Sequence, residues 1–385
     1  MAVIDHVTAF TDTYFPAING VTYTIDLWRS RWTDRYGRMD VVYPRSPTHQ
    51  PRDGELPIPS VPIPTERSQR LGAPVVPNSV SDPEIVHVHT PFTLGMAGVR
   101  FARQCSVPVV ASYHTVLADR LEQYVPHSPF TAWAEDACRR YERRFYDTVD
   151  LITVPSVDAR RRLRSEIDPS PPIEIVSNGI DTALFRPIDP ALFRAEYGIN
   201  EETTVIGYSG RHSPEKHLDE LVDAAAAMDL TAIIAGDGPS RPELEERAQR
   251  LECDVIFPGF LDRELLPALY STLDVFVFPG RIETQGLVAL EANACGTPVV
   301  AVDAGALSHT VLEGETGYHY PPGNIDALCD ALERVQSEQQ RLRNLCLRRR
   351  EMVSVEHSLE HLRALYHKQV TDTARHDSTS VHSHF

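Results

Sequence analysis

Residues 275–291, VFVFPGRIETQGLVALE, contain the pattern that decides the fold. The first four residues are apolar, which is typical of a parallel strand buried on both faces of a sheet. A loop with Gly286 follows, and an apolar stretch beginning at Leu287 predicts a helix. The free N–H groups and the positive dipole end of a helix N-terminus favour an anion such as a diphosphate. The segment therefore predicts a strand, an anion-binding loop and a helix in succession.

Two glutamates stand eight positions apart in this segment, Glu283 in the loop and Glu291 in the helix. Small and apolar residues surround Glu291, so its carboxylate is expected to be partly buried and to need hydrogen-bond donors. Ribose hydroxyls would supply such donors, and Glu283 would accept hydrogen bonds from the hydroxyls of a sugar. The alternative is a capping glutamate and a solvated helix glutamate.

Arg211 and Lys216 form a second candidate cluster, in the stretch GYSGRHSPEK at residues 207–216. An arginine fork and a lysine point charge after a strand would stabilise a departing diphosphate. The alternative is a solvated loop arginine and a lysine at the start of a helix. Phe260 and Leu261 lie in a weaker candidate loop, which would offer backbone groups to the edge of a nucleobase.

Short apolar runs alternate with helix-like stretches in both halves of the chain, which indicates βαβ units and parallel sheets. The expected fold class is α/β, with two doubly wound Rossmann-like domains facing across a cleft. The proline-rich region 44–83 is expected to be an extended loop. The expected parts are a first domain at 1–175, a second domain at 176–352, a helix at 353–370 that packs back on the first domain, and a disordered tail at 371–385.

Gly20 and His114 are the candidate ligand contacts in the first half. Gly20 lies in a loop, where a glycine permits close approach of the backbone to a ligand. His114 directly follows an apolar run, and a histidine at a strand end would contact a sugar. A structural role is the alternative for His114, and His87 and His89, inside an apolar run, are expected to be structural.

The chain is acidic, with a formal net charge of -17. This charge argues against nucleic-acid binding and favours the proteome of a high-salt organism such as a haloarchaeon. No apolar run is long enough for a transmembrane helix, and the first ten residues lack the pattern of a signal peptide, so a cytoplasmic location is expected. Two basic islands, at 139–144 and 160–164, predict either a peripheral contact with an anionic membrane or a solvated helix face.

In these motifs the chain resembles the retaining GT-B glycosyltransferases of family 4, also called glycosyl transferases group 1. The most specific element is Glu-x7-Glu, here Glu283 and Glu291, the latter opening EANACGTPVV. Arg211 and Lys216 match the diphosphate-binding cations of that family. The resemblance assigns the ribose to Glu291, and it assigns the donor sugar to Glu283 with the backbone that includes Gln285, Gly286 and Leu287.

The resemblance also extends to the first half, where Gly20 matches the glycine of the N-terminal loop and His114 matches the acceptor-domain histidine. Residues 87–95, 112–115 and 283–288 look especially like members that glycosylate diacylglycerol or polyprenol-linked acceptors. The first domain would then bind the acceptor and the second the nucleotide sugar. The sequence has no Asp-x-Asp motif, and a mechanism without an essential metal or other cofactor fits the family.

The expected activity is retaining transfer of a hexose from a UDP- or GDP-hexose to a lipid or lipid-linked glycan, by front-face attack. One alternative is a glycosyltransferase with a soluble sugar or glycan acceptor. An alternative from another class is a non-catalytic protein that binds nucleotide sugars.

Overall fold

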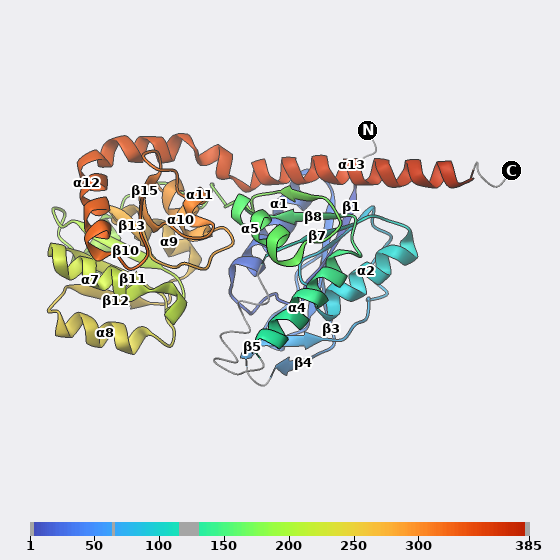
Figure 1. Ribbon diagram of the computed structural model, residues 1–385, viewed down its shortest axis with the longest axis horizontal. Coiled ribbons are helices and arrows are strands. Elements are labelled where there is room, and N and C mark those ends of the chain that lie inside the picture. Colours follow the sequence, from blue (N-terminus) through green and yellow to red (C-terminus); the bar gives the residue numbers. More distant parts are fainter. Residues whose placement is uncertain (1–3, 64–65, 115–130, 382–385) are drawn as a thin grey trace. The chain divides into compact units, whose positions relative to one another are not determined.

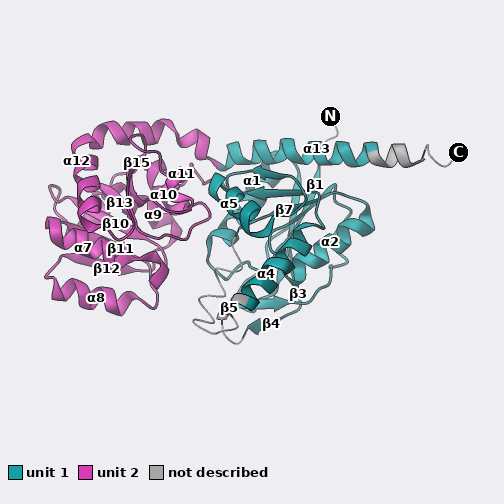
Figure 2. Cartoon of the chain, in the orientation of Figure 1, with its two compact units in different colours: residues 1–178, 355–385 teal, residues 179–354 magenta. Residues whose placement is uncertain are grey.

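The computed structural model describes residues 4–63, 66–114 and 131–381, and the chain divides into two compact units (Figure 2). Unit 1 comprises Met1–Asn178 and Val355–Phe385, and unit 2 comprises Gly179–Ser354. The chain therefore leaves unit 1 once and returns to it near its C-terminal end. Both divisions lie close to the expected boundaries after residues 175 and 352.

A seven-stranded parallel sheet forms the centre of unit 1, in the order β3-β2-β1-β6-β7-β8-β9 (Figure 1). Strands β1, β6, β7 and β8 are buried at every position, as expected for parallel strands that helices cover on both faces. The strands of unit 1 are β1 (His6–Phe10), β2 (Arg38–Pro44), β3 (Glu55–Ile58), β4 (Ser60–Ile63), β5 (Glu66–Gly72), β6 (Ile85–Val88), β7 (Val109–Ser112), β8 (Leu151–Val154) and β9 (Ile173–Ile175).

Region 44–83 is not simply the extended loop that its prolines predict, because it contains β3 and the antiparallel hairpin of β4 and β5. Pro57 lies in β3, which is an edge strand of the main sheet, and proline is tolerated on edge strands because an N–H there has no required partner. Pro62 lies in β4 beside a shift in register. Prolines thus restrict these strands to edges and irregular positions without preventing them.

Helix α13 belongs to unit 1, although it is the last element of the chain. Its residues Leu359, Leu362 and Tyr366 pack with Trp28 and Trp32 of α1 in one buried cluster. The helices of unit 1 are α1 (Gly20–Arg35), α2 (Thr93–Cys105), α4 (Thr131–Tyr146), α5 (Val157–Arg162), the π-helix η1 (Leu163–Ile167) and α13 (Val355–Val381).

The disordered tail expected from residue 371 is wrong as far as Val381, because α13 continues to that residue. The sequence of α13 contains neither glycine nor proline, so nothing in it interrupts the helix. Arg375 also lies 4.0 Å from Asp372, one turn earlier. Residues 382–385 lie outside the described part of the chain.

Unit 2 is built around a six-stranded parallel sheet in the order β12-β11-β10-β13-β14-β15. Its strands are β10 (Val205–Ser209), β11 (Thr231–Ala235), β12 (Val255–Gly259), β13 (Val275–Phe278), β14 (Val299–Val302) and β15 (Gly317–Tyr320). Its helices are α6 (Ala191–Glu196), the 3-10 helix η2 (Pro214–Lys216), α7 (Leu218–Met228), α8 (Arg241–Arg250), the 3-10 helix η3 (Arg263–Leu265), α9 (Leu266–Thr272), α10 (Leu287–Ala294), α11 (Leu307–Thr310), α12 (Ile325–Arg348) and the 3-10 helix η4 (Arg350–Val353).

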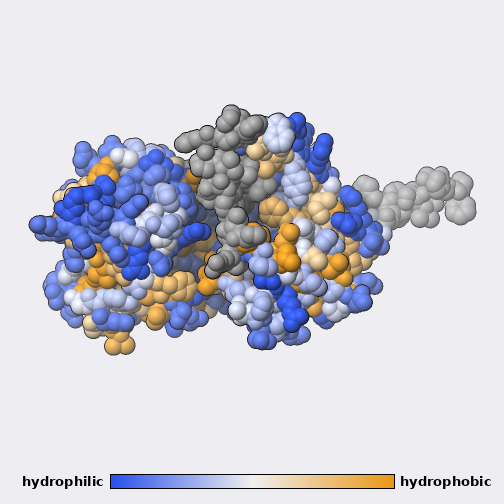
Figure 3. All heavy atoms as spheres, turned by 90° about the horizontal axis from the view of Figure 1, so that it is seen from below, coloured by the Kyte–Doolittle hydropathy of each residue, from blue (hydrophilic) through white to orange (hydrophobic). Residues whose placement is uncertain are grey.

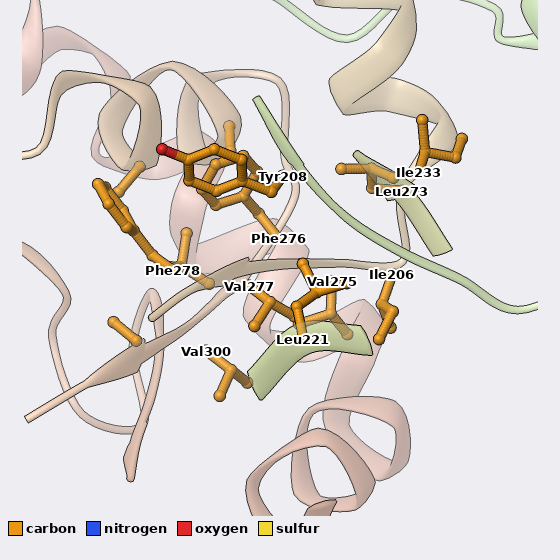
Figure 4. Packing of buried hydrophobic residues seen from close by; sticks show 14 of the residues in the cluster. Ile206, Tyr208, Leu221, Ile233, Leu273, Val275, Phe276, Val277, Phe278 and Val300 are labelled. Carbon is orange, nitrogen blue, oxygen red and sulfur yellow. The ribbon is translucent and has the colours of Figure 1, made fainter. Parts of the chain in front are cut away.

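Aromatic rings fill the core beneath the carboxyl ends of β10 and β13 (Figure 4). The ring of Tyr208 lies 5.8 Å from that of Phe276 and 5.9 Å from that of Phe278. These rings are fully or almost fully buried, so they form a rigid base for the loops that follow both strands.

The two sheets confirm the expected fold class. Within each unit the first strand of the main sheet in sequence order lies in the middle, the next two extend to one edge, and the later strands extend to the other edge. This is the doubly wound Rossmann-like order, and the direction of winding reverses between β1 and β6 in unit 1 and between β10 and β13 in unit 2. In open α/β sheets ligands bind beyond the strand ends at such a reversal.

Candidate active site

The reversal point of unit 2 brings the two main candidate motifs together. Strand β10 pairs directly with β13, with Ile206 opposite Val275, so the loops after these two strands leave the sheet side by side. The first loop carries Arg211 and Lys216, and the second carries Glu283. Pairing of the strands therefore joins sequence segments that are far apart along the chain.

Lys216 and Glu283 form an ion pair between the ammonium group and Oε1 of the carboxylate. Each side chain is only 19% exposed. Burial opposes the charge on Lys216, but the Glu283 carboxylate, together with Tyr208 and Glu215, more than offsets burial and raises the pKa of Lys216 above its ordinary value. Lys216 is therefore held as a cation at the reversal point, beside a carboxylate of the adjacent loop.

Arg211 is exposed and has no hydrogen-bond or ion-pair partner among residues 4–63, 66–114 and 131–381. Its backbone lies in a set of loops that pack closely through glycines. The N–H of Gly236 donates to the carbonyl of Gly259 at 2.7 Å, and a Cβ on Gly236 would lie 1.9 Å from the oxygen of Gly210. Three successive strand-end loops thus form one compact backbone platform next to Arg211.

The N-terminus of α10 is shaped by Gly286, which has a φ of 80° and a ψ of 58°. That left-handed conformation disfavours other residues, and a Cβ there would lie 2.7 Å from Cδ2 of Leu307. The hydroxyl of Thr310 donates to the carbonyl of Gln285 at 2.5 Å, which fixes the preceding peptide. Leu287 is the first helical residue, so the N–H groups of this first turn are those predicted to receive an anion.

Glu291 lies inside unit 2, with only 3% of the residue exposed. Arg263 approaches its Oε1 at 3.0 Å, and the hydroxyl of Tyr270 donates to its Oε2 at 3.0 Å. Burial raises the pKa of Glu291, while Arg263 and Tyr270 act in the opposite direction. The expected burial of this carboxylate is therefore present, and it already has two protein partners.

Arg281 anchors the loop that carries Glu283. Its guanidinium donates to Oε1 of Glu220 at 2.7 Å, and Oε2 of Glu220 accepts from the hydroxyl of Tyr320 at 2.7 Å. Glu220 is 4% exposed, so this carboxylate is a buried link between α7, β15 and the loop. No sequence motif pointed to a role for Arg281, Glu220 or Tyr320.

Phe260 and Leu261 follow β12, in the neighbouring strand-end loop. The Phe260 side chain is 60% exposed, which is high for an aromatic residue. Leu261 is half-buried against the core of unit 2. The structure therefore places these two candidates at the same edge of the sheet as the charged residues.

His114 lies in unit 1, two residues after β7, and is almost fully buried. Its Nε2 forms a 3.0 Å hydrogen bond with Nδ1 of His89, and the two rings are stacked. His89 in turn stacks on His87, whose ring bonds to the hydroxyls of Ser112 at 2.8 Å and Tyr366 at 2.5 Å. Burial lowers the pKa of His87 to about 3 and that of His114 to about 4, so these rings are neutral at neutral pH.

A small cavity of about 60 Å³ lies at the reversal point of unit 1, lined by His114 together with Asp12, His89, Thr90 and Phe92. Asp12 lies two residues after β1, in the loop that follows it, and accepts hydrogen bonds from the hydroxyl of Thr90 at 2.6 Å and the N–H of Leu94 at 3.1 Å. Burial raises the pKa of Asp12. Asp12 and His89 were not predicted as site residues. Their positions shortly after strands β1 and β6 are the sequence signal that would have identified them, because ligands bind beyond the ends of such strands.

Gly20 is the first residue of α1 rather than part of an open loop. Asn19 precedes it as the N-cap, and its side chain accepts a hydrogen bond from the N–H of Thr22 at 2.9 Å. Gly20 is exposed at this helix start. Its position therefore leaves the backbone accessible, at the helix N-terminus that follows the β1 loop.

The two basic islands lie on α4 and on the segment of α5 and η1, and most of their arginines pair with an acid one turn away. These pairs are Arg139–Glu135, Arg140–Asp136, Arg143–Asp147, Arg161–Asp158, Arg162–Glu166 and Arg164–Asp168. Arg144 and Arg160 are exposed and have no acidic partner within the described ranges. Local pairing therefore neutralises most of the positive charge expected from the sequence.

The described residues contain no group of three or more histidine, cysteine, aspartate or glutamate side chains arranged to hold a metal ion. In the same residues, every helix is too short or too polar to cross a lipid bilayer. On the face shown in Figure 3, hydrophilic residues predominate and hydrophobic residues occur in small groups between them.

The fold is that of the GT-B glycosyltransferases. The sucrose-phosphate synthase of Thermosynechococcus elongatus has a TM-score of 0.77 and 22% sequence identity, over 94% of this chain and 98% of that chain. Two family models match as well: glycosyl transferases group 1 over residues 190–351, and glycosyltransferase family 4 over residues 18–184. The two matches fall mainly on unit 2 and unit 1, respectively.

Curated relatives agree with these models. The chain is 31% identical to the GDP-mannose-dependent alpha-mannosyltransferase of Mycolicibacterium smegmatis, over 81% of this chain and 83% of the relative. It is 30% identical to the alpha-monoglucosyldiacylglycerol synthase of Streptococcus pneumoniae, over 76% of this chain and 70% of that enzyme. The chain belongs to the family 4 glycosyltransferases. It is an enzyme of that family, and its substrate is a nucleotide sugar.

Proposed function

We propose that this enzyme transfers a hexose from a nucleoside-diphosphate sugar to a lipid or lipid-linked glycan, with retention of the anomeric configuration and without an essential metal ion. The observation that carries the proposal is the cationic Lys216, paired with Glu283 beside the N-terminus of α10 at the reversal point of unit 2. UDP- and GDP-hexoses are both candidate donors, and GDP-mannose is the first to test because it appears in the name of the mannosyltransferase relative.

The diphosphate would bind Arg211, Lys216 and the first turn of α10. Arg211 is exposed and its guanidinium has no partner among the described residues, and Lys216 is held as a cation by its pairing with Glu283. A diphosphate would compete with Glu283 for Lys216, and its arrival would release the Glu283 carboxylate to accept hydrogen bonds from the hexose hydroxyls. The same pair of residues would thus serve both the phosphate and the sugar.

In the transfer step, the bond between the anomeric carbon and the diphosphate oxygen breaks. The acceptor hydroxyl attacks from the same face, forms the new glycosidic bond, and gives its proton to the departing phosphate. Positive charge develops on the sugar ring, and negative charge develops on the leaving group. Arg211, Lys216 and the helix N-terminus would stabilise that negative charge from fixed positions, which costs little reorganisation during the reaction.

Unit 1 would bind the acceptor around His114. The cavity beside this residue lies at the reversal point of the sheet, where doubly wound folds bind ligands. Phe92 and Val21 contribute apolar surface to it, and Asp12 and the histidine rings contribute polar groups. His114 is neutral and therefore suited to donate or accept one hydrogen bond with a sugar hydroxyl.

A lipid acceptor is supported by the similarity to a synthase whose name specifies a diacylglycerol product. We propose that the enzyme works in the cytoplasm, at the inner face of the membrane. We also propose that Arg144 and Arg160 contact anionic lipid, because neither has an acidic partner in the part of the chain that the structure describes. Vesicle co-sedimentation with and without anionic lipid tests this contact. Equal recovery of the enzyme in both supernatants would remove the membrane part of the proposal.

The net charge of -17 supports a high-salt cellular setting. Repulsion among so many acidic groups is screened by salt, so the enzyme should gain stability as the KCl concentration rises. Thermal unfolding in a series of KCl concentrations measures this effect. An unfolding temperature that falls or stays constant from low to high salt would exclude the adaptation.

The test of the proposed reaction is a transfer screen of UDP- and GDP-hexoses with a membrane lipid extract or free sugars as acceptor. Transfer to lipid supports the proposal, and transfer to free sugars alone would favour the alternative soluble acceptor. Substitution of Arg211 or Lys216 by alanine should lower turnover by more than roughly tenfold, the scale of a lost charge-stabilising donor. Binding of the nucleotide sugar without turnover under any of these conditions would favour the non-catalytic alternative.

A further inference from the structure

Arg263 stands out in unit 2 because it pairs with a carboxylate that the donor is expected to need. Its guanidinium lies 3.0 Å from Oε1 of Glu291, and the side chains are 22% and 4% exposed, respectively. Tyr270 donates to the other carboxylate oxygen at 3.0 Å. A carboxylate this deeply buried is costly unless such donors compensate for the loss of water.

The position of Arg263 is fixed by an aromatic ring. Its guanidinium carbon lies 4.8 Å from the centre of the Phe185 ring, and the same ring lies 6.0 Å from that of Tyr270. Phe185 is fully buried, and its carbonyl accepts a hydrogen bond from Arg350 at 3.2 Å. One anchored phenylalanine therefore supports both side chains that contact Glu291.

We propose that Arg263 is a positioning residue of the donor site, whose guanidinium supplies the fixed counter-charge that lets Glu291 receive ribose hydroxyls as a buried carboxylate. Each carboxylate oxygen can accept two hydrogen bonds, so the oxygens engaged by Arg263 and Tyr270 retain capacity for the ribose. This inference rests on the proposed nucleotide-sugar site, in which Glu291 holds the ribose as the family resemblance implies. It adds a residue that the sequence motif does not contain.

Loss of the arginine would change the protonation of Glu291. Burial already raises the pKa of this carboxyl, and Arg263 is the strongest opposing charge. Without it the pKa would rise further, and protonated Glu291 would offer one hydroxyl donor in place of a full set of acceptor sites. Among the described residues, the ionisable groups near this site besides Tyr270 include Cys295, the C-cap of α10, which interacts with Glu291 and also with Arg343 on α12 and Arg350 on η4.

The experiment measures KM for the donor and kcat of the full-length enzyme between pH 5.5 and 9, for wild type, Arg263→Met and Arg263→Lys. For Arg263→Met we expect the acidic rise in donor KM to move to higher pH by about one unit or more, each unit being tenfold in the ionised fraction. The increase in KM should shrink as the pH rises, and kcat at saturating donor should change less than KM. Arg263→Lys keeps the charge and should remain close to wild type.

Arg247→Met is the matched control, because Arg247 pairs with Asp223 in the same unit and leaves Glu291 untouched. It should leave the pH profile of KM unchanged. The inference about Arg263 is overturned if Arg263→Met has the same pH profile of donor KM as wild type. It is also overturned if Arg263→Lys shifts that profile as far as Arg263→Met does. Glu291→Gln distinguishes a failure of the Arg263 inference from a failure of the ribose contact. If Glu291→Gln leaves donor KM unchanged, the ribose contact of Glu291 is itself overturned.

Discussion

Mild acid should destabilise unit 1, because its buried histidines cannot bind protons while the unit is folded. The pKa of His114 is about 4 in the folded protein, compared with an ordinary value of about 6.5 in the unfolded chain. Between these values the unfolded state binds the additional proton, so the free energy of unfolding falls as the pH falls. From pH 7.5 to pH 5.0 the loss is about 2 kcal/mol for His114 alone.

His87 adds a similar loss, because its pKa of about 3 lies below the same range. The two residues together give about 4 kcal/mol if they titrate independently, a large part of the stability of a typical domain. His89 acts in the same direction. The sequence contains three tryptophans, Trp28, Trp32 and Trp133, and all of them lie in unit 1, so their fluorescence reports on this unit alone.

The assay is urea unfolding followed by tryptophan fluorescence at pH 7.5 and pH 5.0. We expect a clearly lower free energy of unfolding at pH 5.0. His89→Gln removes one of the buried groups and should reduce the difference between the two pH values, whereas His361→Gln, at an exposed position on α13, should preserve it. Equal unfolding free energies at both pH values in wild type would refute the argument.

Three further predictions concern unit 2. Lys216→Met should lower kcat/KM by about a hundredfold or more, which is the scale of losing a preorganised hydrogen-bond donor. Steady-state kinetics measure this loss, and an unchanged circular dichroism spectrum shows that the variant is folded. A change below threefold would contradict the charge-stabilising role. Gly286→Ala should destabilise the protein by about 1–2 kcal/mol or more, because it combines left-handed backbone strain with a buried contact. The control is Gly198→Ala, because Gly198 also has a positive φ, 68°, but nothing lies within 4 Å of the added Cβ. Equal unfolding midpoints for the two variants would show that the contact between the added methyl group and Leu307 has no effect. Glu220→Gln should raise donor KM by loosening Arg281 and the loop it anchors, and an unchanged KM in donor-saturation kinetics would rule out that anchoring role.

Much of the fold could be predicted from the sequence, because strands buried on both faces are nearly continuous apolar runs. β13 and β14 in unit 2 and β6 and β8 in unit 1 are such runs. Strand β1 was not predicted, since its sequence HVTAF includes the polar residues His6 and Thr8. In the folded protein the ring of His6 forms a 3.0 Å hydrogen bond with Asp40 of the neighbouring strand, a contact that the sequence does not show.

The candidate site was predictable only where a local motif carries it. Glu283 and Glu291 form such a motif. Lys216 was predicted because it lies, with Arg211, in a loop that follows a strand. Arg263 and Glu220 lie outside any short pattern, because their partners are brought near by the pairing of strands and the packing of helices. Their roles depend on distances across the sheet that residue spacing does not contain.

The return of the chain to unit 1 affects how the protein is synthesised. Leu359, Leu362 and Tyr366 of α13 pack on Trp28 and Trp32. This part of the core of unit 1 is therefore incomplete until α13 has left the ribosome. Unit 2 is continuous in sequence and has its own core, which allows it to fold earlier during translation. During synthesis the surface around Trp28 and Trp32 therefore lacks its covering helix until the second half of the chain is completed, and a chain interrupted before Val355 would expose this surface to chaperones and proteases.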